Sequence, residues 1–301
     1  MRNTKITMCL VVMCVTAAAN FASADTIQGI NIDFVNIGNA GNVGDTRTGT
    51  DQYGLPLVNP YGSGAVGYNY RIGKYEVTNA QWNTFTAAVG APTGSPSDAY
   101  VIGSLFTGAQ QPTNNISWYE AAQFCNYLTS GNKSLGAYQL GADGSITVDR
   151  TAAISTYGTT YVIPTEDEWY KAAYFKPNGG YSLYANGTSI TPIAGVNTNY
   201  QNEEMGQPWN IGTGTQEQNG TFDMMGNVWE WNENLAYSTN LGFRGGSYTN
   251  NYVPTLGSSY WVYSYPGSEY HNVGFRVASV PEPCSLVLLS LGGLYLRKRK
   301  K

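Results

Sequence analysis

The chain has 301 residues and a formal net charge of −4 at pH 7, with 16 basic residues, 20 acidic residues and one histidine. Seven of the basic residues lie at the two ends, so residues 25–279 hold nine basic and 19 acidic side chains, a net charge of about −10. This charge argues against nucleic acid and anionic membrane surfaces as partners, because both attract basic proteins. It favours cations, neutral glycans and basic proteins instead.

The N-terminal 24 residues are typical of a secretory signal peptide. A basic head, Met1-Arg-Asn-Thr-Lys5, precedes an apolar run from residue 6 to about residue 19 and a small-residue site, Ala22-Ser-Ala24. The apolar run is shorter than the roughly 20 residues that a membrane span needs. We therefore expect export and cleavage before Asp25, which leaves one domain over residues 25–279.

The C-terminal residues 280–301 contain three features in a fixed order. Pro281-Glu-Pro283 comes first, a largely apolar run over residues 285–296 follows, and five cations end the chain. This order resembles the PEP-CTERM sorting tail of exported bacterial proteins. The resemblance implies processing by an exosortase, transient membrane anchoring through the tail, and a Gram-negative bacterium that makes extracellular polysaccharide. As a helix the apolar run would span only about 18 Å, which is short for a bilayer.

Short apolar runs over residues 27–35 and 64–70 lie between Gly, Asn, Asp and Pro, which predicts strands and turns. Residues 176–220 are rich in Gly, Asn, Thr and Tyr without a clear period, and we expect a long ordered loop there. A closing strand is expected over residues 274–278. Only Cys125 lies within the domain, so no internal disulfide is available.

Three helices are predicted from capping boxes, in which a Ser or Thr is followed three residues later by Glu or Gln. The pairs are Thr78 with Gln81, Ser117 with Glu120, and Thr165 with Glu168. The acidic residues at these starts, Glu120, Glu166, Asp167 and Glu168, are interpreted mainly as charges that favour a helix N-terminus. Cys125 lies on the apolar face of the second helix and is interpreted as a buried small hydrophobe.

The stretch Asp223-Met-Met-Gly226-Asn-Val228-Trp-Glu230 combines two carboxylates with a Gly-Asn bend. Calcium prefers oxygen ligands from carboxylates and backbone carbonyls, and Gly and Asn tolerate the left-handed backbone that turns carbonyls inward. The same pattern also fits a turn that enters a core strand with exposed acids. Spacing alone leaves both readings open.

Six motifs taken together resemble the formylglycine-generating enzyme (sulfatase-modifying factor) family over roughly residues 27–279. They are Lys74-Tyr-Glu-Val-Thr-Asn79, Ile116-Ser-Trp-Tyr-Glu-Ala121, Ile163-Pro-Thr-Glu-Asp-Glu-Trp169, Phe222-Asp-Met-Met-Gly-Asn-Val-Trp-Glu-Trp231, Arg244-Gly-Gly-Ser247 and Gly274-Phe-Arg276. The resemblance implies an α+β domain with the C-type-lectin-like fold of the sulfatase-modifying factor type, low in regular secondary structure. It also implies structural calcium held by the side chains of Asp223 and Glu230 and the carbonyls of Gly226 and Val228, with a second calcium site near Asn197 and Thr198.

The chain departs from the family's enzymes where they hold copper(I) on two cysteines. Counted from Arg244, those places hold Asn250 and Thr255. The family also pairs a cysteine of the second helix, present here as Cys125, with one in the closing strand, where this chain has Val277. Copper(I) needs soft thiolate ligands, so this departure argues against copper. A related branch uses iron held by histidines, and this chain has only His271.

We therefore expect an exported, non-catalytic binding module that recognises a glycan or surface protein associated with the cell surface or exopolysaccharide. Tyrosines interleaved with Ser, Gly and Asn are typical of adaptable binding loops. The expected ligand-binding residues are Asn250, Tyr252, Tyr260, Trp261, Tyr263, Tyr265 and Tyr270. One alternative is a divergent formylglycine-generating-type oxidase acting on protein cysteine, and another is a purely structural protein. The expected location is the periplasm, the outer cell surface or the extracellular matrix.

Overall fold

The computed structural model describes residues 23–58, 63–94, 96–100, 103–201, 206–237 and 239–280. These residues form an α+β domain with three sheets, in agreement with the expected fold class. The five-stranded sheet has the order β1 (Ser23–Ile27), β2 (Ile30–Ile37), β3 (Tyr70–Gly73), β11 (Ala278–Val280) and β6 (Thr160–Val162). The four-stranded sheet has the order β10 (Val273–Gly274), β7 (Trp229–Tyr237), β8 (Asn240–Arg244) and β9 (Val262–Ser264). A hairpin of β4 (Tyr138–Leu140) and β5 (Ile146–Val148) is the third.

The first predicted strand, over residues 27–35, is in fact divided between the two strands of a hairpin. Gln28 and Gly29 both have positive φ, 50° and 81°, and form a two-residue turn between β1 and β2. Such turns match the right-handed twist of the flanking strands. The second predicted strand, over residues 64–70, is wrong except for its last residue, because β3 begins at Tyr70.

All three predicted capping boxes are present. They start α1 (Asn79–Val89), α2 (Trp118–Ser130) and α4 (Glu166–Tyr174), and in each the cap side chain and the third residue of the helix exchange hydrogen bonds. A fourth helix, α3 (Arg150–Tyr157), was not predicted. Asp149 caps it by accepting a hydrogen bond from the backbone N–H of Ala152, a signal that the sequence does contain.

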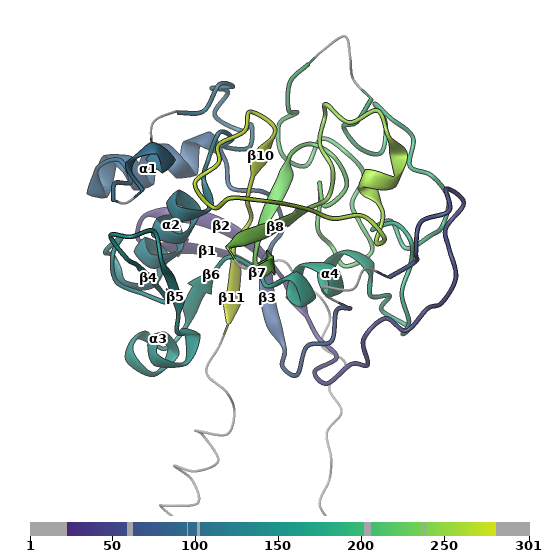
Figure 1. Cartoon of the computed structure of the whole chain (residues 1–301), viewed down its shortest axis with the longest axis horizontal. Coiled ribbons are helices and arrows are strands. Elements are labelled where there is room, and N and C mark those ends of the chain that lie inside the picture. The colour runs from purple at the N-terminus through teal and green to yellow at the C-terminus, as the bar shows by residue number, and fades with distance from the viewer. Residues whose placement is uncertain are drawn as a thin grey trace, which may run out of the picture.

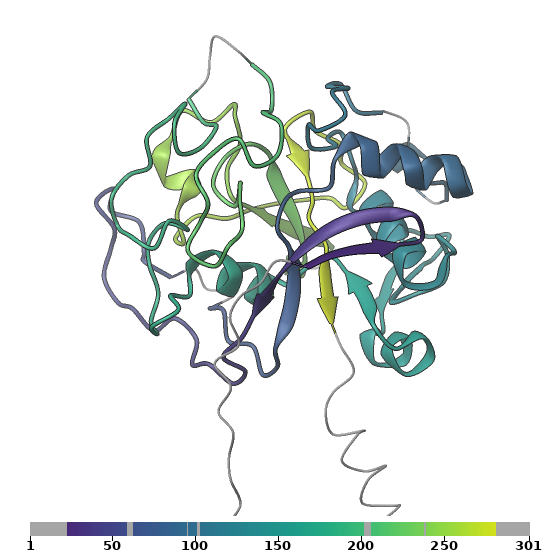
Figure 2. The same cartoon turned by 180° about the vertical axis from the view of Figure 1, so that it is seen from behind.

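Helices α1, α2 and α3 lie on the opposite side of the molecule from the long loops, whereas α4 lies nearer the loops (Figure 1). In two opposite views, α1, α2 and α3 gather at one side, and the loop-rich chain before β7 lies at the other (Figures 1 and 2). The structure confirms the expected loop over the described part of residues 176–220, where only isolated bridges pair. Tyr181, Tyr184 and Tyr200 are buried there, which explains why this loop is ordered.

The five-stranded and four-stranded sheets meet in an aromatic core around α2 and β7. The indole N–H of Trp118 donates to the carbonyl of Asn232 (3.1 Å), and that of Trp231 donates to the carbonyl of Ile116 (2.9 Å). Both tryptophans are fully buried. The expected single closing strand is replaced by two short ones, β10 and β11, so the last described residues belong to both large sheets.

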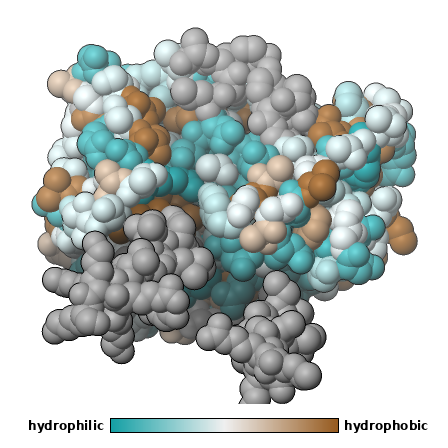
Figure 3. Space-filling model, turned by 90° about the horizontal axis from the view of Figure 1, so that it is seen from below, coloured by the Kyte–Doolittle hydropathy of each residue, from teal (hydrophilic) through white to brown (hydrophobic). Residues whose placement is uncertain are grey.

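The surface seen from below mixes hydrophilic and hydrophobic residues, with hydrophobic ones in small groups (Figure 3). Within the described ranges, none of the helices is long and apolar enough to cross a membrane. The expected tail after residue 280, and all but Ser23 and Ala24 of the expected signal peptide, lie outside the described residues. Both of these remain predictions.

Candidate functional site

Arg244, at the end of β8, anchors the segment in which ligand-binding residues are expected. Its side chain is fully buried and forms an ion pair with Glu166 at the start of α4. The same guanidinium donates to the carbonyls of Ser258 (3.1 Å) and Tyr260 (2.7 Å). Arg244 therefore fixes the backbone of this segment against α4, because a buried charge needs all of these partners.

The acidic residues at helix starts do more than complement the helix dipole, which corrects the interpretation from sequence. Besides Arg244, Glu166 binds the Asn232 amide (2.6 Å). The fully buried Glu168 pairs with Arg150 (2.8 Å). Asp167 accepts two backbone N–H bonds, from residues 63 and 64, each of 2.8 Å. These contacts join α4 to strands and loops that are distant in sequence.

A tight loop follows Arg244. Gly245 and Gly246 have φ of 101° and 77°, and a Cβ on Gly246 would lie 2.8 Å from a methyl carbon of Leu256. The side-chain oxygen of Asn250 accepts from the Ser247 N–H (2.7 Å) and hydroxyl (2.9 Å). Asn250, one of the predicted ligand-binding residues, therefore shapes this loop.

Two of the predicted tyrosines belong to a row of aromatic rings that runs from the core to the surface. The rings of Trp229, Tyr260, Tyr252 and Tyr53 follow one another with centroid separations of 6.2, 6.1 and 6.3 Å. Trp229 is buried, whereas Tyr252 and Tyr53 are 45% and 40% exposed. The predicted site did not include Tyr53, because it is about 200 residues from Tyr252 and only the fold brings the two together.

The other predicted aromatic residues fall into separate places. Trp261 and Tyr263 stack with a centroid distance of 5.3 Å at β9. The hydroxyl oxygens of Tyr270 and Ser264 are 3.0 Å apart and form a hydrogen bond. Tyr265 instead lines a cavity of about 380 Å³ beside the β4–β5 hairpin, together with Tyr119. The structure thus gathers most of the predicted aromatic residues into two separate groups, the row and the stacked pair. Tyr265 belongs to neither group.

The residues predicted to hold calcium lie in a buried, hydrogen-bonded cluster. Gly226 and Asn227 have φ of 81° and 59°, which confirms the expected bend. Each carboxylate oxygen of Glu230 accepts a hydrogen bond of 2.5 Å from Arg276, and one of them also accepts from the Trp169 indole N–H (2.7 Å). Across the described ranges, no group of three or more His, Cys, Asp or Glu side chains is arranged to hold a metal ion.

Carboxyl groups nevertheless outnumber cations in this cluster. Glu76, Glu217, Asp223 and Glu230 are all buried around Arg276. Burial raises the pKa of Glu217 to about 8 and that of Asp223 to about 6, and it raises the pKa of Glu76 well above its usual range. A cation beside Asp223 would offset this excess. For Glu230 to serve as a ligand, it would have to share its oxygens with Arg276 and Trp169.

The positions that the resemblance assigns to functional cysteines, two for copper and one in the second helix, have structural roles here. Thr255 is buried and donates to the Tyr252 carbonyl (2.8 Å). Cys125 is fully buried in α2, as predicted, and burial raises the pKa of its thiol well above the usual value. The thiolate is the reactive form of cysteine, so this residue is held in an unreactive state.

Comparison with known proteins agrees with this architecture. A model of the sulfatase-modifying factor enzyme 1-like domain, FGE-sulfatase, matches residues 39–280. The chaperone protein LppX of Paenibacillus barcinonensis is 23% identical over 184 residues, which cover 54% of this chain and 61% of LppX. The match therefore spans less than two thirds of that relative.

Solved structures share the fold. Treponema denticola variable protein 1 superposes with a TM-score of 0.62 at 21% identity, covering 87% of this chain and 100% of that one. PvdO from Pseudomonas aeruginosa gives 0.60 at 15% identity, covering 88% and 99%, and CarF gives 0.57 at 24% identity, covering 84% and 99%. Identities this low show the fold alone. The family model matches most of the chain, however, and this protein therefore belongs to the sulfatase-modifying factor enzyme 1-like domain family, with its C-type-lectin-like fold.

Proposed function

We propose that this protein is an exported, non-catalytic binding module that recognises a glycan, carried by the cell surface or exopolysaccharide, through aromatic residues of segment 249–273. The observation that carries the proposal is the pair of aromatic groups at the surface: the row that ends in Tyr252 and Tyr53, and the stacked Trp261 and Tyr263. Aromatic faces with neighbouring hydroxyl and amide groups suit the apolar faces and hydroxyls of sugars.

The backbone that carries these rings is held in place before any ligand binds. Arg244 binds the carbonyls of Ser258 and Tyr260. Arg47 donates to the Ser258 hydroxyl (3.0 Å), and Ser259 donates to Asp51 (3.1 Å). Fixing a binding surface in advance reduces the entropy lost on association.

A binding role rather than oxidation is supported by the replaced ligand positions. Asn250 and Thr255 stand where the resemblance places copper-binding cysteines, and both use their side-chain oxygens within the loop. Cys125 is buried, and His271 is the chain's one histidine. No observation favours the alternative oxidase.

Export, the sorting tail and calcium belong to the same proposal. Residues 1–24 support export, and residues 280–301 support exosortase processing and transient anchoring, which would place the domain at the cell surface or in the matrix of a Gram-negative bacterium. The excess of buried carboxylates near Asp223 supports a structural calcium ion.

The test is a binding screen of the full chain against an array of neutral bacterial polysaccharides, followed by titration of each positive. We expect saturable binding that Trp261→Ala and Tyr252→Ala each weaken at least about tenfold, since stacked aromatic rings dominate such interfaces. Tyr157→Ala is the matched control, because Tyr157 is 39% exposed on α3 and lies outside segment 249–273. Binding that survives both substitutions, or conversion of a cysteine peptide to its aldehyde by the copper-loaded protein, would refute the proposal.

A further inference from the structure

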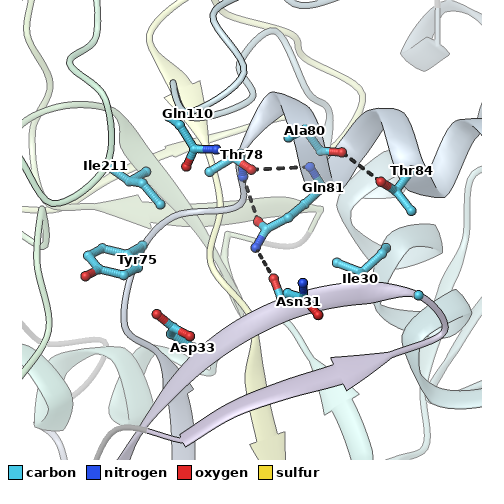
Figure 4. Close-up of a pocket in the computed structure, with 11 residues that line it drawn as sticks. Ile30, Asn31, Asp33, Tyr75, Thr78, Ala80, Gln81, Thr84, Gln110 and Ile211 are labelled. Atoms are coloured by element: carbon cyan, nitrogen blue, oxygen red, sulfur yellow. Dashed lines mark hydrogen bonds between the residues drawn. The ribbon is translucent and has the colours of Figure 1, made fainter.

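A second cavity, of about 490 Å³, lies between the β1–β2 hairpin and the start of α1. Figure 4 shows Asn31 and Asp33 on β2, Thr78 and Gln81 at the start of α1, and Tyr75, Gln110 and Ile211 on the other walls. None of the lining residues belongs to segment 249–273. Its volume is in the range of small-molecule sites.

The walls of this cavity are fixed by contacts between distant segments. The Gln81 amide accepts from the Thr78 N–H (2.9 Å) and donates to the Asn31 carbonyl (2.6 Å), as Figure 4 shows. The Ile211 N–H donates to the Gln110 carbonyl (2.9 Å). These bonds join β2, α1 and the two loops, so the cavity is a built feature of the fold.

The Tyr75 ring is held equally firmly. A Cβ on Gly212 would lie 2.7 Å from a ring carbon of Tyr75, so only glycine allows this loop to approach so closely. The Tyr75 ring also packs against Phe222, with 5.4 Å between ring centroids, and the Lys74 ammonium lies 5.2 Å from the Tyr75 centroid. Packing therefore fixes the Tyr75 ring as one wall of the cavity.

Three polar groups of the lining have no partner within the part of the chain that the structure describes. They are the half-buried carboxylate of Asp33, the hydroxyl of Tyr75 and the side-chain amide of Gln110. Asp33 is the one charged residue of the lining, and Lys74 makes no ion pair with it. Asp33 and Tyr75 are half-buried and Gln110 is exposed, so all three can be reached by a ligand. A fixed cavity lined by such polar groups is a usual form of a small-molecule site.

We propose that this cavity binds a small molecule that carries a protonated amine and several hydroxyl groups, the chemistry of an amino sugar. The Asp33 carboxylate binds the amine in a charge-assisted hydrogen bond. The Tyr75 hydroxyl and the Gln110 amide each donate and accept, and so bind sugar hydroxyls. The excess of acidic residues in the domain adds attraction for a cation.

Isothermal titration calorimetry of the full chain at about pH 6.5, where a sugar amine is protonated, tests this inference. The probes are glucosamine, glucose, N-acetylglucosamine and ethanolamine. We expect glucosamine to bind at least about tenfold more tightly than each of the others, since it alone combines the charge with several hydroxyl groups. Asp33→Asn should remove the preference for glucosamine over glucose, and Tyr75→Phe should weaken both sugars.

Asp98→Asn is the matched control, because Asp98 is exposed on the 3-10 helix Ser97–Tyr100 and does not line the cavity. It should bind glucosamine like the unchanged protein. Three results would overturn the inference: no saturable binding of glucosamine, equal binding by Asp33→Asn, or ethanolamine binding as tightly as glucosamine. Trp261→Ala should leave this binding unchanged, so failure here is distinguishable from failure of the proposed glycan surface.

Discussion

Arg276 holds Glu230 through two hydrogen bonds of 2.5 Å, one to each carboxylate oxygen, and both side chains are fully buried. Arg276 also donates to the carbonyls of Gly73 and Phe222, each at 2.9 Å. One guanidinium therefore joins the end of β3, the stretch before β7 and the start of β7 itself. This side chain therefore links three segments of the buried cluster that contains the residues predicted to hold calcium.

Replacing Arg276 should destabilise the protein severely. Arg276→Met leaves the Glu230 carboxylate buried without its cation, and we expect a loss of about 3–5 kcal/mol in the free energy of unfolding. Arg71→Met is the control, because Arg71 pairs with Asp25 at a partly exposed place and such pairs contribute about 0–1 kcal/mol. Urea unfolding followed by tryptophan fluorescence measures both. Similar losses in the two variants would contradict the role given to Arg276.

The glycine loop after Arg244 should tolerate no side chain at its second position. Gly246→Ala introduces a Cβ at positive φ and against Leu256, and we expect a loss of about 1–3 kcal/mol. Gly103→Ala is the control, since nothing lies within 4 Å of a Cβ there and its φ is not positive. Thermal unfolding of both variants checks this, and a Gly246→Ala variant as stable as Gly103→Ala would show that the loop relaxes freely.

Stability should fall as the pH rises from about 4.5 to about 8. Burial raises the pKa of Glu217 from 4.5 to about 8, so the folded protein binds more protons than the unfolded chain between these values. The contribution of this group is fully present below its unfolded pKa and is lost as pH rises through its folded pKa. Asp223, with a pKa raised to about 6, acts in the same direction.

Glu217→Gln should flatten this profile, because the amide keeps an acceptor for Thr221 and never ionises. We expect the decline in unfolding free energy between pH 5 and pH 8 to shrink by about 1 kcal/mol or more. Both profiles are measured with EDTA in the buffer, so that bound divalent cations do not affect the stability. A profile that is unchanged in Glu217→Gln would mean that this carboxyl is solvated in solution.

Calcium should oppose that decline if it binds beside Asp223. Adding calcium should then raise the melting temperature at pH 8, and EDTA should reverse the rise, because a ligand that binds only the folded state stabilises it by mass action. Asp223→Asn and Glu230→Ala should each abolish the shift. Magnesium, which demands a stricter geometry, is the comparison ion. A melting temperature indifferent to calcium would dismiss the predicted site.

The sequence by itself determined the features whose causes are local. A capping box needs only a hydroxyl and an acceptor three residues apart, so the starts of α1, α2 and α4 were predictable from Thr78, Ser117 and Thr165. The bend at Gly226 and Asn227 follows from the same kind of reasoning. The ordered series of motifs also indicated the family, and with it the C-type-lectin-like fold.

Only the tertiary structure decided which distant groups meet. Glu166 looked like a helix-start charge, and its partner Arg244 is 78 residues away; Tyr53 meets Tyr252 across an even longer stretch. The cavity beside Asp33 needs walls from four separate segments. Hydrogen bonds within one helical turn can be predicted from residue spacing. Long-range pairs depend on how whole elements pack, because packing decides which side chains are buried next to one another and so removed from water.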